Sequence, residues 1–107
     1  MAESVLDGIN DLPTMVKLPE IVTLCGSLKF KDKYFEVMKK LSLEGKIVIP
    51  CAGIAQDEIT EEQKRMLDKL HLRKIDLSDS IYVINLGGYI GESTRREIEY
   101  AQNQGKL

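Results

Sequence analysis

Short apolar runs alternate along the chain with longer segments in which apolar residues recur every three or four positions. The short runs, rich in β-branched residues, predict buried strands, and the three-to-four spacing predicts amphipathic helices. The predicted strands are residues 21–24, 46–49 and 81–86, and the predicted helices are residues 30–43, 60–78 and about 93–104.

Turn and capping residues mark the ends of these segments. Gly45 follows the first helix at the position where a glycine often closes a helix, and Pro50 ends the second strand. Thr60 and Gln63 have the spacing of a capping box and begin the second helix. Gly105 ends the last helix. These boundaries support three strand–helix pairs in succession.

Such alternation indicates an α/β fold, a doubly wound parallel sheet of the Rossmann or flavodoxin-like kind in a small three-layer domain. Right-handed crossovers favour the strand order 2-1-3. A three-stranded sheet is thin, and the sequence ends where a fourth strand would begin, so we expect the last strand to be missing or supplied elsewhere. Ligands of such sheets bind beyond the carboxyl ends of the strands, here between residues 25–29 and 86–97.

The first twenty residues differ from the rest of the chain. Turn-forming residues such as Gly8, Asn10 and Pro13 stand there among scattered apolar ones. We therefore expect an N-terminal arm at residues 1–20, either loose or packed on a neighbour, and an α/β domain at residues 21–107.

Composition narrows the classes of function. The chain has 107 residues, enough for one hydrophobic core, and a net charge of −2, which provides no basic face for duplex nucleic acid. No apolar run approaches the roughly 20 residues of a membrane span, and the N-terminus lacks the pattern of a signal peptide. Two cysteines, Cys25 and Cys51, make neither a disulfide framework nor a metal cluster. We expect a cytoplasmic protein with no membrane partner, no metal and no cofactor.

Residues 85–101 place glycines directly before the hydroxyl and charged residues of the last helix. The positive end of a helix favours an anion, typically a phosphate, and glycines let the backbone approach it closely. The loop after the first strand has a similar Gly-Ser pair and is expected on the same side of the sheet. The candidate anion-binding residues are Gly26, Ser27, Gly87, Gly88, Gly91, Ser93 and Thr94.

Glu97 lies beside this predicted anion site, and its carboxylate has two interpretations. As a nucleophile it would attack the sugar of a bound nucleotide and form a glycosyl-enzyme intermediate. As a structural residue it would pair with Thr94 in a capping box, which has the same spacing. The spacing alone leaves both interpretations open.

Four further residues near the predicted crevice have a functional and a structural interpretation. His71 is a general acid for a departing base or a packed residue on an apolar helix face. Cys25 contacts the ligand or is packed at the end of the first strand. Glu92 binds a sugar hydroxyl or favours the helix N-terminus, and Arg95 binds a phosphate or faces solvent.

Several short segments carry a resemblance: Leu-Cys-Gly-Ser at 24–27, Ser-Asp at 78–79, Arg-Glu-Ile-Glu-Tyr-Ala at 96–101 and Gln-Gly-Lys at 104–106. Together they resemble the nucleoside 2-deoxyribosyltransferase family and its relatives, the 2′-deoxynucleoside 5′-phosphate N-hydrolases. The resemblance implies that Glu97 is the nucleophile that attacks the anomeric carbon, and that Gly26, Ser27, Ser93 and Thr94 hold a 5′-phosphate. The glycine pattern also resembles phosphoribohydrolases that release cytokinin bases, which break the same type of bond.

Two positions depart from the family pattern. Thr23 stands near the place of a tyrosine that positions the nucleophile in the family. Counting back from Asp79 gives His71 where the family has a catalytic aspartate, and Asp76 matches only if the helix is aligned with a gap. These departures affect the residues that would assist the nucleophile and transfer protons in the implied mechanism.

The sequence therefore predicts cleavage or transfer of the N-glycosidic bond of 2′-deoxynucleosides or their 5′-monophosphates, with a small nucleoside or nucleotide as substrate. A non-catalytic nucleotide-binding or sensor module on the same scaffold is the alternative. A weaker hypothesis is a small oligomerisation module. In each case we expect a homo-oligomer, because a thin sheet with a long second helix leaves apolar surface to cover.

Overall fold

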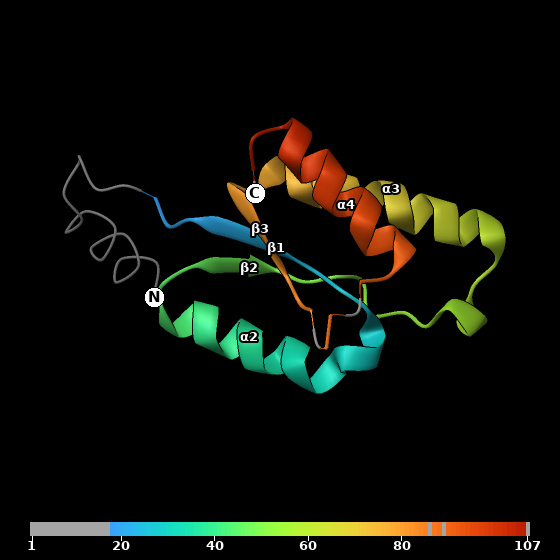
Figure 1. Cartoon of the computed structure of the whole chain (residues 1–107), viewed down its shortest axis with the longest axis horizontal. Coiled ribbons are helices and arrows are strands. Elements are labelled where there is room, and N and C mark those ends of the chain that lie inside the picture. Colours follow the sequence, from blue (N-terminus) through green and yellow to red (C-terminus); the bar gives the residue numbers. More distant parts are fainter. Residues whose placement is uncertain (1–17, 86, 89, 107) are drawn as a thin grey trace, which may run out of the picture.

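The computed structural model describes residues 18–85, 87–88 and 90–106. The predicted arm falls outside these residues except for 18–20, which are exposed and form neither helix nor strand. The elements follow the predicted alternation (Figure 1). In chain order they are β1 (Ile21–Cys25), η1 (Leu28–Phe30), α2 (Lys31–Leu43), β2 (Ile47–Ile49), η2 (Gln56–Glu58), α3 (Glu61–Leu77), β3 (Ser80–Val83) and α4 (Glu92–Asn103).

Strand β1 is the centre of the sheet that the described residues form, with β2 and β3 as its two parallel neighbours. Ile21 pairs with Ile47 on one side, and Val22 pairs with Ser80 on the other. The order β2-β1-β3 confirms the predicted order 2-1-3. It also means that the chain reverses its direction of winding between β2 and β3, so the loops after β1 and β3 are adjacent.

Helices cover both faces of this sheet, with α2 on one face and α3 and α4 on the other (Figure 1). Alternate residues of β1 face opposite sides, as strand geometry requires. Val22 and Leu24 pack with the buried face of α2, which supplies Tyr34, Val37 and Leu41. The second cluster joins α3 and α4 to the sheet and consists of Cys25, Ile75, Ile81 and Ala101.

The predicted helix ends are confirmed where local chemistry determines them. The Thr60 hydroxyl accepts a hydrogen bond from the Gln63 backbone N–H at 3.1 Å, and the Gln63 side chain accepts one from the Thr60 N–H at 3.0 Å. This is the predicted capping box. Gly45 follows α2 with a φ of +85°, which a residue with a Cβ rarely adopts.

Most predicted boundaries shift by one residue, and two of the differences have a local cause. The first helix begins later because Ser27 caps a short 3-10 turn, accepting a hydrogen bond from the Lys29 N–H, before α2 starts at Lys31. Strand β3 covers Ser80–Val83 rather than 81–86, and the chain turns at Gly87 and Gly88, both with positive φ. Residue 86 of that prediction lies outside the described residues.

The outer surface of α3 is partly apolar. Met66, Leu70 and Leu77 are 55, 44 and 70 % exposed, although the helix is otherwise rich in charged residues. Within the described ranges, no helix has both the length and the apolar character needed to cross a bilayer.

Candidate functional site

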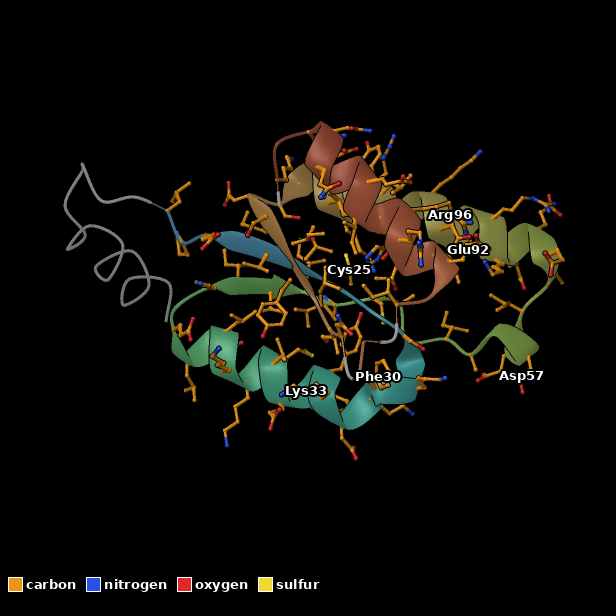
Figure 2. The ribbon with its side chains drawn as sticks, in the orientation of Figure 1. Cys25, Phe30, Lys33, Asp57, Glu92 and Arg96 are labelled. Atoms are coloured by element: carbon orange, nitrogen blue, oxygen red, sulfur yellow. The ribbon has the colours of Figure 1, made fainter. Side chains whose placement is uncertain are left out.

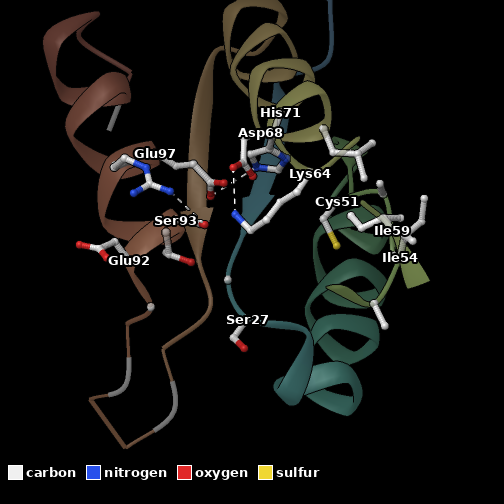
Figure 3. Close-up of a pocket in the computed structure, with 18 of the residues that line it drawn as sticks. Ser27, Cys51, Ile54, Ile59, Lys64, Asp68, His71, Glu92, Ser93 and Glu97 are labelled. Atoms are coloured by element: carbon white, nitrogen blue, oxygen red, sulfur yellow. Dashed lines mark hydrogen bonds and ion pairs between the residues drawn. The ribbon is translucent and has the colours of Figure 1, made fainter. Parts of the chain in front are cut away.

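A cavity of about 640 Å³ lies beyond the carboxyl ends of the strands, at the point where the winding reverses (Figure 3). Five segments form its walls: the loop after β1, Tyr34 of α2, the loop after β2, one face of α3 and the first two turns of α4. Its volume is within the roughly 300–1,000 Å³ typical of pockets for small ligands. The predicted position of the site therefore coincides with a real cavity.

The loop after β1 approaches β3 closely at Gly26. A Cβ at this position would lie 3.0 Å from the Cβ of Ile84 and 3.1 Å from its carbonyl oxygen. The Ile84 N–H also donates a hydrogen bond of 2.8 Å to the carbonyl of Cys25. Glycine is therefore needed at residue 26 so that the two predicted loops can meet at one cavity.

Glu97 projects from α4 into the cavity and faces His71 of α3 (Figure 3). Its Oε1 lies 3.6 Å from His71 Nε2, which in turn lies 3.5 Å from Cys25 Sγ. The Cys25 sulfur lies within 4.8 Å of the ligating oxygen of Glu97. Cys25 and His71 are buried, and the Glu97 side chain is only 14 % exposed. Three ionisable groups from three elements thus meet at the inner end of the cavity.

Burial is the main reason why the pKa of Glu97 is raised to about 7. The neighbouring Cys25 thiol opposes this shift, the negative charge of Asp68 adds to it, and the positive charge of Arg96 opposes it. A carboxyl group with such a pKa exists in both protonation states near neutral pH. Strongly perturbed groups in a cavity are candidates for catalysis.

Burial also lowers the pKa of His71 to about 4, helped by the positive charge of Lys74 and opposed by the negative charge of Asp68. The imidazole is therefore neutral at pH 7, and its contact with Glu97 is not an ion pair there. A neutral imidazole can orient the carboxyl group, whereas donating a proton to a leaving base requires the charged form.

Lys64 and Asp68 line the same cavity, and the sequence analysis did not identify them. The Lys64 ammonium lies 3.1 Å from the Asp68 carboxylate, one helical turn away (Figure 3). A signal was present, because residues 64, 67, 68 and 71 fall on one face of a helix. Once that helix is known to overhang the crevice, this polar face must form its wall.

The hydroxyl residues predicted to hold a phosphate are on the cavity wall. Ser27, Ser93 and Thr94 line it, and Thr94 is buried. The Ser93 hydroxyl accepts a hydrogen bond of 3.4 Å from the Arg96 guanidinium, so a cation is near the start of α4. Arg96 lines the cavity, whereas Arg95 is exposed and is not part of the lining.

The capping box of Thr94 and Glu97 is not present. The N-cap of α4 is Gly91, which has no side chain to bond the first turn, and Thr94 already lies inside the helix. The structural interpretation of Glu97 is therefore wrong, because the helix begins one turn earlier than that interpretation requires.

Of the remaining predicted residues, two line the cavity and three do not. Gly91 and Glu92 line it. Gly87 and Gly88 form an exposed turn outside the lining, and Cys25 is completely buried behind it.

Of the three residues considered at the departing family positions, His71 lines the cavity, whereas Thr23 and Asp76 do not. The Thr23 hydroxyl is fully buried against the Ser78 hydroxyl at 2.6 Å and the Lys74 carbonyl at 3.1 Å. Asp76 is exposed and accepts a hydrogen bond from the Tyr100 hydroxyl. A tyrosine does line the cavity, but it is Tyr34 of α2.

Comparisons of the chain with protein-family models, with curated proteins and with solved structures find no match. What the cavity can do chemically therefore follows from its own residues.

Proposed function

We propose that this protein cleaves or transfers the N-glycosidic bond of a 2′-deoxynucleoside or its 5′-monophosphate, with Glu97 as the nucleophile. The observation that carries the proposal is the position of Glu97, which faces a cavity of ligand size with a pKa raised to about 7. The flavodoxin-like arrangement of the sheet supports it, because ligands of such sheets bind at this edge.

In the first step a Glu97 oxygen attacks the anomeric carbon of the sugar, and the bond from that carbon to the base nitrogen breaks. The base leaves with the bonding electron pair and takes up a proton. A water molecule or a second base then displaces the carboxylate, which regenerates Glu97. A sugar without a 2′-hydroxyl fits this chemistry, because the positive charge developing at the anomeric carbon is then less destabilised.

Asp68 is one of two further carboxyl groups on the cavity wall, with Glu92, and paired carboxyl groups are typical of glycosidic bond cleavage. In our proposal the Lys64–Asp68 ion pair exchanges the proton with the departing or arriving base, because the Lys64 ammonium carries the proton that the ionised Asp68 lacks. His71 acts as a neutral partner that orients Glu97. This assignment replaces the expectation that His71 itself is the acid.

The start of α4 and the loop after β1 are suited to the 5′ end of the substrate. Ser27, Ser93 and Thr94 offer hydroxyl groups, and Arg96 adds a positive charge. The N-terminus of α4, whose cap residue has no side chain, adds the favourable end of a helix dipole. A 5′-phosphate placed there would leave the sugar within reach of Glu97.

The test uses chromatography to measure base release from a panel of deoxynucleosides and their 5′-monophosphates. The wild-type protein is compared with Glu97→Gln and with the control Glu99→Gln, which changes an exposed carboxylate on the same helix. We expect release by the wild type and the control only. Release that persists in Glu97→Gln contradicts the role of Glu97.

A non-catalytic nucleotide-binding module is the second candidate, because His71 is neutral where the family resemblance implies an acid. Nucleotide-dependent thermal stabilisation with no base release from any substrate would favour it. In either case we infer a homo-oligomer in a cytoplasmic setting, in which a second copy covers the exposed Met66, Leu70 and Leu77 of α3.

A further inference from the structure

Cys25, His71 and Glu97 offer three different metal-ligating atoms around one point. Cys25 Sγ lies 3.5 Å from His71 Nε2, and His71 Nε2 lies 3.6 Å from Glu97 Oε1. All three donor atoms lie within 4.8 Å of one another. Among the described residues, these three form a group that could hold a metal ion.

The spacing agrees with tetrahedral coordination of zinc. Zinc–sulfur bonds of about 2.3 Å and zinc–nitrogen or zinc–oxygen bonds of about 2.0–2.2 Å, set at tetrahedral angles, place the donor atoms roughly 3.3–3.6 Å apart. The two measured distances match this range. The third pair, Cys25 Sγ and the Glu97 carboxylate oxygen, lies within 4.8 Å, so a side-chain adjustment of about 1 Å brings all three atoms to the coordination distances.

The donor set selects the class of metal. One thiolate, one imidazole and one carboxylate suit a borderline ion such as Zn²⁺ or Co²⁺. Mg²⁺ and Ca²⁺ prefer oxygen ligands and larger coordination numbers, which this cluster does not provide.

The three ligands come from rigid elements, so the site is preorganised. Cys25 ends the central strand, His71 lies inside α3 and Glu97 inside α4. His71 and Glu97 line the cavity while Cys25 lies behind them, so the fourth coordination position faces the cavity. Three protein ligands with one open position are typical of zinc sites that bind a further molecule.

We propose that Cys25, His71 and Glu97 bind one thiophilic divalent cation, Zn²⁺ in the first place, and that the bound ion blocks the Glu97 carboxylate. Binding forms a metal–sulfur bond and releases the thiol proton to the buffer. The binding half stands without the proposed reaction. The blocking half rests on the proposed function, because a carboxylate that coordinates a metal cannot attack a sugar.

Binding is tested by titrating tag-free protein with Co²⁺ and recording the near-ultraviolet charge-transfer band that a cobalt–thiolate bond produces. We expect the band at one equivalent in the wild type and in Cys51→Ser, which removes the other cysteine. We expect no band in Cys25→Ala. No band in the wild type, or a band that persists in Cys25→Ala, overturns the proposal.

Two further variants keep the test independent of a folding defect in Cys25→Ala. Glu97→Gln and His71→Gln retain the thiol, so a weaker thiolate band remains. Their Zn²⁺ affinity, measured by competition with a chromophoric chelator, should fall by more than the about 10–100-fold that outer-shell changes cost. Unchanged affinity in both variants contradicts the proposed ligand set.

The blocking half is tested by base release with and without Zn²⁺. We expect Zn²⁺ to suppress release and EDTA to restore it. Zn²⁺ binding with undiminished release overturns the blocking half alone. If no substrate is cleaved even in EDTA, the proposed function fails, while the Co²⁺ band still decides whether the metal site exists.

Discussion

Thr23 and Cys25 lie two residues apart on the central strand, and both contact α3. The Thr23 hydroxyl pairs with the neutral Ser78 hydroxyl and with the Lys74 carbonyl, away from the cavity. Cys25 instead meets two ionisable groups, His71 and Glu97, at the inner end of the cavity. One buried polar cluster is neutral and satisfied, whereas the other is titratable and open to a ligand.

The comparison shows where this fold can support chemistry. A satisfied neutral pair stabilises the sheet and has little tendency to react. A desolvated carboxyl group beside a cavity is less stable but more reactive, and such strain is typical of functional sites. The two clusters differ because their partners stand at different positions along α3. Ser78 follows the C-terminus of α3, inside the domain, whereas His71 faces the cavity.

The largest effect should come from Glu97→Gln. We expect base release to fall by about 10³-fold or more, because the attacking oxygen is lost while the side chain keeps its shape. Circular dichroism should show an intact fold. The measurement is the rate of base release under saturating substrate. A loss of less than tenfold would mean that the two buried clusters do not differ in function.

A second effect should appear in the pH dependence, measured in EDTA. The carboxylate form of Glu97 is the nucleophile, and its pKa is about 7. Release should therefore fall about tenfold for each pH unit below 7 and level off above it. A rate that is constant from pH 5 to 8 would contradict this role.

The raised pKa of Glu97 also predicts how stability depends on pH: stability should fall as pH rises, whereas the rate of base release should increase. Because the pKa is higher in the folded state than in the unfolded state, the folded protein loses stability as pH rises from about 4.5 through 7. Glu97→Gln removes this loss, so its melting temperature should exceed that of the wild type at pH 8 and approach it at pH 4. Calorimetry at the two pH values checks the sign.

Thr23→Val tests the other cluster. The valine keeps the shape of the side chain but leaves the Ser78 hydroxyl without one partner, so we expect a loss of about 1–2 kcal/mol in the free energy of unfolding. Urea denaturation measures this loss. Base release at 25 °C should stay within twofold of the wild type. If Thr23→Val lost activity but kept its stability, the Thr23 cluster would have a functional role rather than a structural one.

The smallest effect on stability should come from Lys64→Gln. The ion pair with Asp68 is partly exposed, with side chains 26 and 42 % accessible, so its contribution to stability is at most about 0.5 kcal/mol. Urea denaturation should detect little change. A larger loss would show that this wall of the cavity is held more firmly than an exposed pair allows.

Much of the cavity could be anticipated from local patterns. Ser27, Gly91, Ser93 and Thr94 stand at loop and helix starts that the topology brings to one edge of the sheet, and all four line the cavity. Asp68 was not found because it looks like any charged residue on a helix. Only the extension of α3 past the strand ends turns that face into a wall.

Sequence by itself determined the order of the elements, the parallel sheet and the edge of the sheet at which the cavity lies, because periodicity, capping residues and crossover handedness act locally or by general rule. Tertiary structure alone decided which polar groups meet. Cys25, His71 and Glu97 are far apart in the chain and come from three elements. Their pKa shifts arise from burial, and the short distances between their donor atoms arise from contacts between these elements. Local patterns do not encode those distances, since each depends on how the helices pack on the sheet.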